Sequence, residues 1–218
     1  MVHNNQQVLE YWERDEVESM YDNHLLAAEI AMIARRLKSG AKILDAGCGE
    51  GEGTLASASI RGTTVHGADF SKTRLLKAQS RLSGMQNVSL RHVDFLNDKL
   101  PLDEDYDFIV SQRFLINSTE WRLQQKVLQK LVSLLQPGGR LLILEGSTQD
   151  VDELNSFRSI WGLPPIPVKW HNLFFDDDDD VLIAFMSSCR CTLVECDGLG
   201  SYFLLTRGIR PVFDKELN

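Results

Sequence analysis

The sequence predicts an α/β protein with a parallel sheet, and three observations lead to this prediction. Short apolar runs alternate with helical patterns over residues 41–144, aspartates follow several of these runs, and a glycine-rich stretch follows the first. Alternating strands and helices form a parallel sheet with helices on both faces. The 218 residues are enough for one large domain with a buried core.

The individual elements follow from the spacing of the apolar residues. The predicted helices lie, in chain order, at residues 8–18, 24–37, 54–59, 71–84 and 119–135. The predicted strands lie at residues 41–46, 63–69, 88–93, 106–111 and 140–144. Ser71 caps the fourth helix, and the Pro-Gly-Gly sequence at 137–139 ends the fifth.

The chain after residue 145 departs from this alternation. Residues 150–175 are expected to be irregular, with a rigid proline-rich loop at 162–167. Residues 192–195 and 201–206 are expected to form two closing strands, separated by glycines. No linker is long enough to divide the chain into two domains.

Composition is typical of an ordinary globular enzyme, with 43% hydrophobic and 25% charged residues. The net charge of −8 argues against nucleic acid as the main partner, because phosphate neutralisation needs a surplus of Lys and Arg. No apolar run reaches the roughly 18 residues that a membrane span needs. The first residues lack the features of a secretory signal, so we expect a cytoplasmic protein.

Two groups of residues raise the question of a metal site. Cys189, Cys191 and Cys196 cluster, but zinc would need a fourth ligand and the nearest histidine, His171, lies eighteen residues upstream. Five aspartates at 176–180 are either a cation site or the solvated start of a helix, where carboxylates stabilise the helix dipole. We favour the structural interpretation of both groups and predict no metal.

The glycine-rich stretch at residues 43–54 carries most of the functional information. A dinucleotide fingerprint, G-x-G-x-x-G, fails because its third glycine would fall on Glu52 or Thr54, depending on the register. A phosphate-binding P-loop fails as well, because no Gly-Lys-Ser/Thr follows. Glycine loops of this kind still allow close approach of the backbone to a ligand.

This stretch resembles motif I of the class I S-adenosylmethionine-dependent methyltransferases, D-x-G-x-G-x-G. The matching residues are Asp45, Gly47, Gly49 and Gly51, with Cys48 inside the motif. The resemblance covers about residues 40–146. It implies S-adenosylmethionine as cofactor and S-adenosylhomocysteine as product. It also implies a Rossmann-like, mostly parallel sheet of seven strands that ends in an antiparallel C-terminal hairpin.

Further cofactor positions follow from their places at strand ends. Asp69 lies 24 residues after Asp45 and is placed to accept the ribose hydroxyls. Its surroundings resemble the second motif of the family, which implies that Phe70 lines the adenine. Asp94 lies where the family often contacts the adenine amino group, with Phe95 beside it. We add Ser111, which begins the segment after the fourth strand, to these candidates.

Candidate catalytic residues lie on the acceptor side. The Asn/Asp-Pro-Pro signature of adenine and glutamine methyltransferases is absent after the fourth strand, where Arg113 instead offers a cation for a carboxylate or phosphate. Its alternative role is an ion pair with a nearby acid. His171 is the candidate general base, against a purely structural role. Glu145 is another candidate contact.

The N-terminal residues 1–38 are predicted to form a helical lid, with Trp12 and Tyr21 against the cofactor or packed on the sheet. Residues 39–218 then form the methyltransferase domain, with a substrate-side insertion at 147–180. The oligomeric state is left open, with a homodimer as one option.

The first hypothesis is O-methylation of a sugar, glycan precursor or metabolite hydroxyl. The second is an N- or carboxyl-methyltransferase of a small carboxylate. The third is a protein that binds S-adenosylmethionine without transferring the methyl group.

Overall fold

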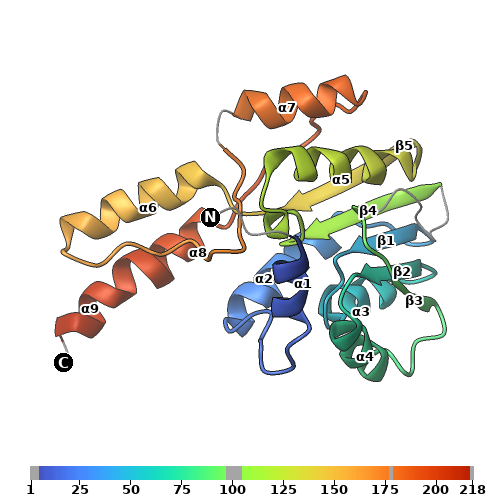
Figure 1. Ribbon diagram of the computed structural model, residues 1–218, viewed down its shortest axis with the longest axis horizontal. Helices are drawn as coiled ribbons and strands as arrows, with labels where there is room; N and C mark the ends of the chain where they lie inside the picture. Colours follow the sequence, from blue (N-terminus) through green and yellow to red (C-terminus); the bar gives the residue numbers. More distant parts are fainter. Residues whose placement is uncertain (1–4, 97–104, 177–178, 217–218) are drawn as a thin grey trace. The chain divides into compact units, whose positions relative to one another are not determined.

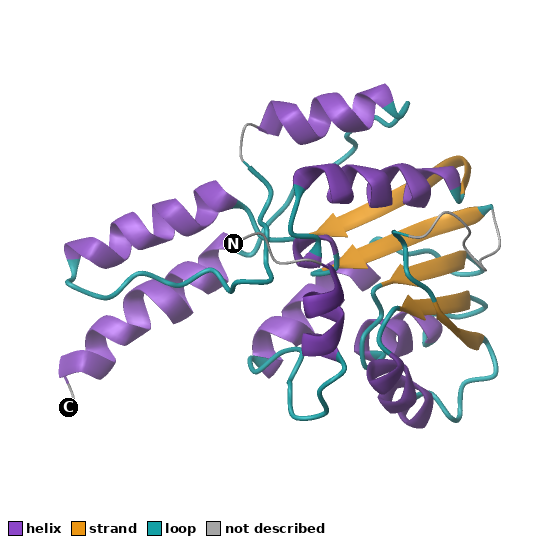
Figure 2. Ribbon diagram, in the orientation of Figure 1, coloured by secondary structure: helices purple, strands orange, loops and turns teal. Residues whose placement is uncertain are grey.

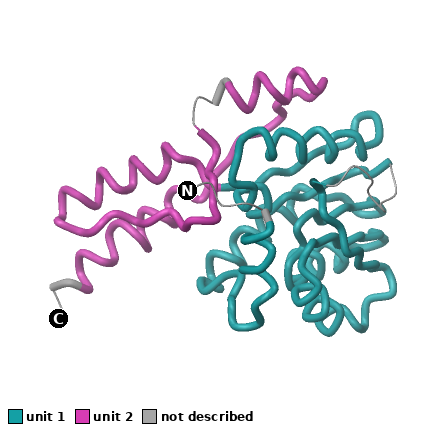
Figure 3. The backbone as a smooth tube through the Cα atoms, viewed as in Figure 1, with its two compact units in different colours: residues 1–145 teal, residues 146–218 magenta. Residues whose placement is uncertain are grey.

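The computed structural model describes residues 5–96, 105–176 and 179–216. The chain divides into two compact units, unit 1 at residues 1–145 and unit 2 at residues 146–218 (Figure 3).

Unit 1 is built on a sheet of parallel strands in the order β3-β2-β1-β4-β5 (Figure 1). The strands are β1 Lys42–Ala46, β2 Thr64–Asp69, β3 Val88–His92, β4 Tyr106–Gln112 and β5 Leu135–Leu144. The chain runs outward from β1 through β2 to β3, then returns to place β4 on the other side of β1. This reversal is the switch point at which open parallel sheets bind their ligands.

The helices of unit 1 are α1 Asn5–Trp12, α2 Asn23–Ala34, α3 Glu52–Ala58, α4 Lys72–Arg81 and α5 Trp121–Ser133, with a short 3₁₀ helix η1 at Leu115–Asn117. The first helix was expected to reach residue 18 and instead ends at Trp12. The acidic side chain that follows caps α4 rather than extending α1: the Glu13 carboxylate accepts the N–H groups of Lys72 and Thr73.

Both faces of the sheet are buried, as the sequence predicts. On one face Ile43, Val65 and Phe108 pack with Ile33 of α2 and Ala58 of α3. Side chains alternate along a strand, so the neighbours of these residues point to the opposite face. That second face is equally buried: the side chains of Leu44 and Ile109, each next to a residue of the first cluster, are fully inaccessible to solvent.

Unit 2 is helical in its described residues, and the predicted C-terminal hairpin is wrong for them (Figure 2). Its helices are α6 Thr148–Ile160, α7 Asp179–Ser188, α8 Gly200–Phe203, the π-helix η2 at Leu204–Ile209, and α9 Arg210–Glu216. Residues 192–199 contain no strand. The described sheet therefore has five strands, all parallel, rather than seven.

The physical reason for the error lies in the apolar run that begins at Tyr202. A continuous apolar run does not alternate, so its period does not separate a buried strand from a helix. Here the run continues as helix, with the Thr206 hydroxyl bonded to the Tyr202 carbonyl one turn back. Residues 150–175 were also misjudged as wholly irregular, because the Ser147 side chain accepts the Asp150 N–H and starts α6.

Candidate functional site

The glycine-rich loop connects β1 to α3 and is fixed by its own amides. The N–H groups of Gly47 and Cys48 donate to the Ala68 carbonyl at 2.8 and 3.1 Å, and the N–H of Gly49 donates to the Asp69 carboxylate at 2.9 Å. The sequence predicts only that the backbone of this loop can approach a ligand closely, and it does not show which amides are already bonded within the protein. These three amides fasten the loop to the end of β2, which leaves a ligand to approach other atoms of the loop.

The loop has open space beside Gly49, where a bound group could lie. Gly47, Gly49 and Gly51 all have positive φ angles, of 73°, 53° and 85°, which favour glycine. A Cβ added to Gly47 would lie 2.5 Å from the Phe114 ring, whereas one added to Gly49 would meet no atom within 4 Å. Gly47 is therefore required by packing, and Gly49 borders open space.

Asp45 lies at the end of β1 and is buried, with 5% of its surface exposed. Its Oδ2 accepts the Thr54 hydroxyl of α3 at 2.6 Å. Burial raises the pKa of Asp45 to about 6, against the lowering effect of this hydrogen bond. A positive group bound nearby would stabilise the ionised carboxylate.

Asp69 is held at the end of β2 with both carboxylate oxygens directed by the backbone. Oδ2 accepts the Gly49 N–H and Oδ1 accepts the Ser71 N–H at 2.8 Å. Burial raises the pKa of this carboxyl above its ordinary value, although the two amides oppose the shift. Each carboxylate oxygen has further lone pairs, so the group can still accept hydrogen bonds from a ligand.

The three candidates around an adenine site lie after β2 and β3. The Phe70 carbonyl bonds to the His92 ring at 2.9 Å, and Phe70 itself is half-buried. Asp94 is exposed, and its Oδ1 accepts the Leu96 N–H at 2.8 Å. Phe95 is buried and packs edge-on against Phe114, with ring centroids 5.2 Å apart.

The loop after β4 is organised by Glu145, at the end of β5. Its carboxylate accepts the N–H groups of Phe114 and Leu115 at 2.9 and 2.8 Å, and the hydroxyl of the buried Ser111 at 3.2 Å. Removal from water raises the pKa of Glu145 to about 7, in spite of these donors. Glu145 thus fixes the start of η1.

Arg113 is engaged by an acid that the sequence analysis did not single out. Its guanidinium donates through Nε and Nη2 to the carboxylate of Glu29 on α2, at 2.9 and 2.5 Å. Gln112 donates to the same carboxylate at 2.9 Å, and Glu29 is only 2% exposed. The ion-pair alternative for Arg113 is therefore present in this structure, and Arg113 has a positive φ of 51°.

His171 belongs to unit 2, and it is buried with 2% of its surface exposed. Burial lowers its pKa to about 4, so the imidazole is neutral at physiological pH. The neighbouring Trp170 ring packs edge-on against it at 5.1 Å between centroids.

The two N-terminal candidates differ in their surroundings. The Trp12 indole donates to the side chain of Asn117 in η1 at 3.1 Å, and the Trp12 carbonyl accepts the Ser71 hydroxyl at 3.2 Å. Trp12 thus lies between the loop after β4 and the start of α4. Tyr21 is 71% exposed.

In unit 1, sequence reasoning missed the buried charged residues Glu29 and Arg74, and a signal for both was present. Glu29 falls at helical spacing between the apolar Leu25 and Ile33 of α2, all three of them buried. Arg74 falls one turn before the buried Ala78 of α4. A charge on the apolar face of a helix needs a partner inside the protein, and each of these has one.

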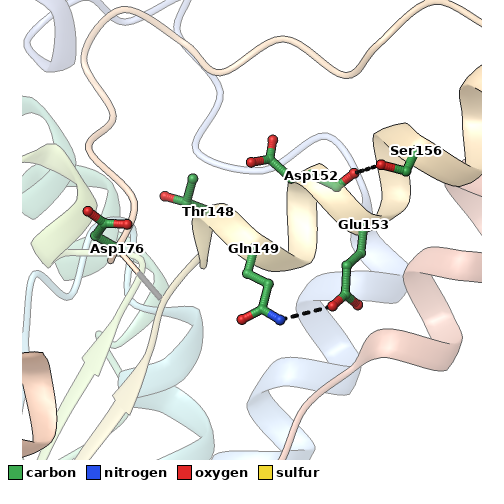
Figure 4. A pocket seen from close by; sticks show the side chains of 6 residues that line it. All are labelled: Thr148, Gln149, Asp152, Glu153, Ser156 and Asp176. Atoms are coloured by element: carbon green, nitrogen blue, oxygen red, sulfur yellow. Dashed lines mark hydrogen bonds between the residues drawn. The ribbon is translucent and has the colours of Figure 1, made fainter. Parts of the chain in front are cut away.

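A surface hollow of about 550 Å³ lies within unit 2 (Figure 4). Residues of α6 and Asp176 line it: Thr148, Gln149, Asp152, Glu153, Ser156 and Asp176. Gln149 bonds to Glu153 one turn along α6, at 3.0 Å. Within residues 5–96, 105–176 and 179–216 no group of three His, Cys, Asp or Glu side chains is arranged to hold a metal ion.

Two other sequence features can be placed only in part. Residues 177 and 178 of the aspartate run lie outside the described residues, and α7 begins directly after them at Asp179. All four cysteines are free thiols. Of the helices in the described part of the chain, none is long and apolar enough to cross a bilayer.

Comparison with known proteins now identifies the class. A family profile described as a methyltransferase domain matches residues 37–162, which is more than half of the chain. The chain belongs to this family and carries a class I S-adenosylmethionine-dependent methyltransferase domain. S-adenosylmethionine is the methyl donor of the family and S-adenosylhomocysteine its product.

Among curated relatives, the chain is 36% identical over 147 residues to the demethylmenaquinone methyltransferase of Clavibacter sepedonicus, covering 63% of this chain and 58% of that protein. It is 28% identical over 146 residues to the demethylmenaquinone methyltransferase of a Geobacillus species, covering 65% and 61%. The chain thus spans less than two thirds of the length of these relatives.

Two solved structures share the fold at low identity. The N-methyltransferase NodS of Bradyrhizobium japonicum, in complex with S-adenosylhomocysteine, has a TM-score of 0.54 and 19% identity, covering 65% of this chain and 72% of that one. The [4+2]-cyclase SpnF has a TM-score of 0.64 and 18% identity, covering 86% and 73%. The fold is therefore found with different chemistries, and function has to be argued from the site.

Proposed function

We propose that this protein transfers the methyl group of S-adenosylmethionine to a small-molecule acceptor. The observation that carries the proposal is the carboxylate of Asp69, held by the Gly49 and Ser71 amides at the end of β2, which pairs with β1 beside the switch point of the sheet. A buried carboxylate oriented in this way suits a pair of neighbouring hydroxyl groups, such as those of a ribose.

The remaining cofactor candidates have complementary roles in this proposal. S-adenosylmethionine, when bound, supplies an electrophilic methyl group on a positively charged sulfur. Asp45 attracts the positive groups of the amino-acid end, and Gly49 leaves room for it. Phe70 and Phe95 provide apolar walls for an adenine, and Asp94 is an acceptor for its amino group.

On the acceptor side, the loop after β4 presents the methyl acceptor to the cofactor. Ser111 and Glu145 fix the backbone of this loop, because the Ser111 hydroxyl and the following amides all bond to the Glu145 carboxylate. Methyl transfer is an in-line displacement, so positioning and the exclusion of water contribute most of the rate. Arg113 would contact an acidic acceptor only by sharing its bonds with Glu29.

Within residues 1–38, we further propose that the described segment before α2 forms a lid over the cofactor, because Ile33 of α2 itself packs in the core of the sheet. The support for this role is the position of Trp12, which bonds to η1 through its indole and to Ser71 of the α4 cap through its carbonyl. We place Tyr21 at the exposed rim of this lid.

His171, neutral at physiological pH, is in the protonation state that a general base requires.

For the acceptor we propose a hydroxyl of a sugar, glycan precursor or other small metabolite. A second candidate is demethylmenaquinone, which is favoured by the 36% identity to a demethylmenaquinone methyltransferase. N- or carboxyl-methylation of a small carboxylate is a further alternative, in which Arg113 would share its bonds between Glu29 and the acceptor. A protein that only binds the cofactor is the remaining alternative.

The test is methyl transfer from labelled S-adenosylmethionine to a panel of sugar, phenol, carboxylate and demethylmenaquinone acceptors. We expect label in one acceptor class with the wild type and little or none with Asp69→Ala. Label in the sugar class supports the first candidate, and label in demethylmenaquinone supports the second. Cofactor binding without transfer to any member would favour the non-catalytic alternative.

A further inference from the structure

Arg74 joins three separate segments of unit 1 through one buried side chain. It lies on α4 and is only 2% exposed. Its Nη1 pairs with the carboxylate of Glu50, and its Nη2 donates to the carbonyl of Val17. The guanidinium also lies over the Trp12 ring, 5.3 Å from the centroid. The three segments are α4, the glycine-rich loop and residues 12–17 of the N-terminal region.

The contact with the glycine-rich loop falls at its centre. Glu50 lies between Gly49 and Gly51, which are two of the three loop glycines with a positive φ. Lys77, one turn after Arg74, lies 3.5 Å from the same carboxylate, and Arg81 donates to the Glu50 carbonyl at 2.8 Å. Residues three, four or seven apart share one face of a helix, so α4 presents a basic face to this loop.

Residues 12–17 are fastened to the start of the same helix. The Glu13 carboxylate accepts the N–H groups of Lys72 and Thr73, at 2.8 and 3.1 Å. Asp15 forms an ion pair with Lys77 at 2.9 Å. This segment and the glycine-rich loop therefore share α4 as their support, and Arg74 is the buried contact common to both.

Stability alone gives a weak reason for a buried arginine at this position. A buried ion pair contributes little net stability compared with apolar side chains of similar volume, because both charges lose their hydration. Moreover, the Nε of Arg74 is buried without a hydrogen-bond partner among the described residues, which carries a further cost. What the guanidinium provides, and an apolar side chain would not, is a fixed position for Glu50.

We propose that Arg74 is a positioning residue for the cofactor. It acts through Glu50 on the glycine-rich loop and through Val17 on residues 12–17. Because both segments are held by the same side chain, a change in the position of one segment affects the position of the other. This inference rests on the proposed function, since it concerns affinity for S-adenosylmethionine. Coupling of this kind is reciprocal, so bound cofactor also stabilises residues 12–17.

The first test compares two buried arginines by calorimetric titration with S-adenosylhomocysteine. Arg74→Met removes the proposed coupling. Arg158→Met is the matched control, because Arg158 of α6 is also buried and its guanidinium donates to the carbonyls of Pro164 and Arg207. Both variants should be less stable than the wild type. Only Arg74→Met should bind more weakly, by about tenfold, the size of effect typical of residues that act on a ligand through an intermediate group.

An unchanged affinity of Arg74→Met would overturn the inference, as would an equal loss in Arg158→Met. If the wild type does not bind S-adenosylhomocysteine, the proposed function is refuted and the role of Arg74 is refuted with it. Wild-type binding that survives in Arg74→Met refutes only the inference.

A second variant keeps the test decisive if Arg74→Met does not fold. Glu50→Gln breaks the same ion pair at a side chain that is 20% exposed, so it leaves the core intact. We expect weaker binding here too. Trypsin cleavage after the exposed Arg14, followed by mass spectrometry, should be slowed by S-adenosylhomocysteine in the wild type and less so in Glu50→Gln. A cleavage rate in the wild type that is the same with and without S-adenosylhomocysteine would contradict the coupling.

Discussion

Gly47 and Gly49 belong to one motif but are glycines for different physical reasons. The Phe114 ring packs against Gly47, so a Cβ atom at Gly47 would collide with the ring at a distance of 2.5 Å. Gly49 has a free approach on its Cβ side, and only its φ of 53° disfavours another residue. The motif therefore contains one residue required by packing and one that keeps the approach to the ligand open.

Alanine substitution should distinguish the packing role of Gly47 from the ligand-approach role of Gly49. Gly47→Ala should lower the free energy of unfolding by about 2–4 kcal/mol, from strained backbone plus overpacking. Gly49→Ala should cost only about 1 kcal/mol, from its backbone alone, but it should lose affinity for S-adenosylhomocysteine. Urea denaturation and calorimetry measure the two quantities.

Gly198→Ala is the matched control for both variants. Gly198 has open space around it and no positive φ, and it should change neither quantity. Full cofactor affinity in Gly49→Ala would show that Gly49 does not border the ligand.

At the scale of elements, the loop after β4 depends on a carboxylate at the end of the neighbouring strand. Glu145 binds the amides at the start of η1, and burial raises its pKa from 4.5 to about 7. In the folded protein this group therefore holds a proton at pH values where the unfolded chain has released it. Its contribution to stability is full below about pH 4.5 and is lost as the pH rises through 7.

Glu145→Gln should remove this dependence. As the pH rises from 5 to 8, the wild type should lose roughly 1–3 kcal/mol of unfolding free energy relative to Glu145→Gln. Urea denaturation at a series of pH values measures the difference. His171 changes stability in the opposite sense, because its pKa is lowered, but it is present in both proteins and cancels. The exposed Glu153→Gln should give no such difference, and parallel curves for Glu145→Gln would contradict the account.

Elements with an apolar run bounded by a glycine or an acid could be predicted from the sequence. The strand expected at 41–46 is β1 at Lys42–Ala46, and the one expected at 63–69 is β2 at Thr64–Asp69. The C-terminal segments are separated by glycines as well, but the apolar run from Tyr202 does not alternate, and it forms helix instead of strand. Periodicity decides an element only when the residues alternate or when flanking residues limit its length.

The candidate site shows the same division. The glycine-rich loop and Asp69 could be located because a run of alternating glycines and an acid at the end of a predicted strand are visible in a single sequence. The partner of Arg113 could not be located, because Glu29 lies 84 residues away in sequence and only the fold brings the two together. Long-range pairs of buried charges depend on tertiary structure, and a single sequence shows only that each charge needs a partner.

For the whole molecule, the family and the parallel sheet are established, whereas the acceptor and the roles of the site residues are proposals. The net charge of −8 favours a ligand that carries positive groups, and carboxylates such as Asp45 and Asp69 would make the potential negative at the site itself. We propose that S-adenosylmethionine binds beside the glycine-rich loop and the end of β2, within reach of the Asp69 carboxylate.

Calorimetric titration of the wild type, Asp69→Ala and the exposed Asp152→Ala with S-adenosylmethionine tests this claim most directly. Asp69→Ala should lose about 1.5–3 kcal/mol of binding free energy, because hydrogen bonds to a charged group are lost. Asp152→Ala should bind as the wild type does. Equal affinity in the wild type and Asp69→Ala would contradict the claim.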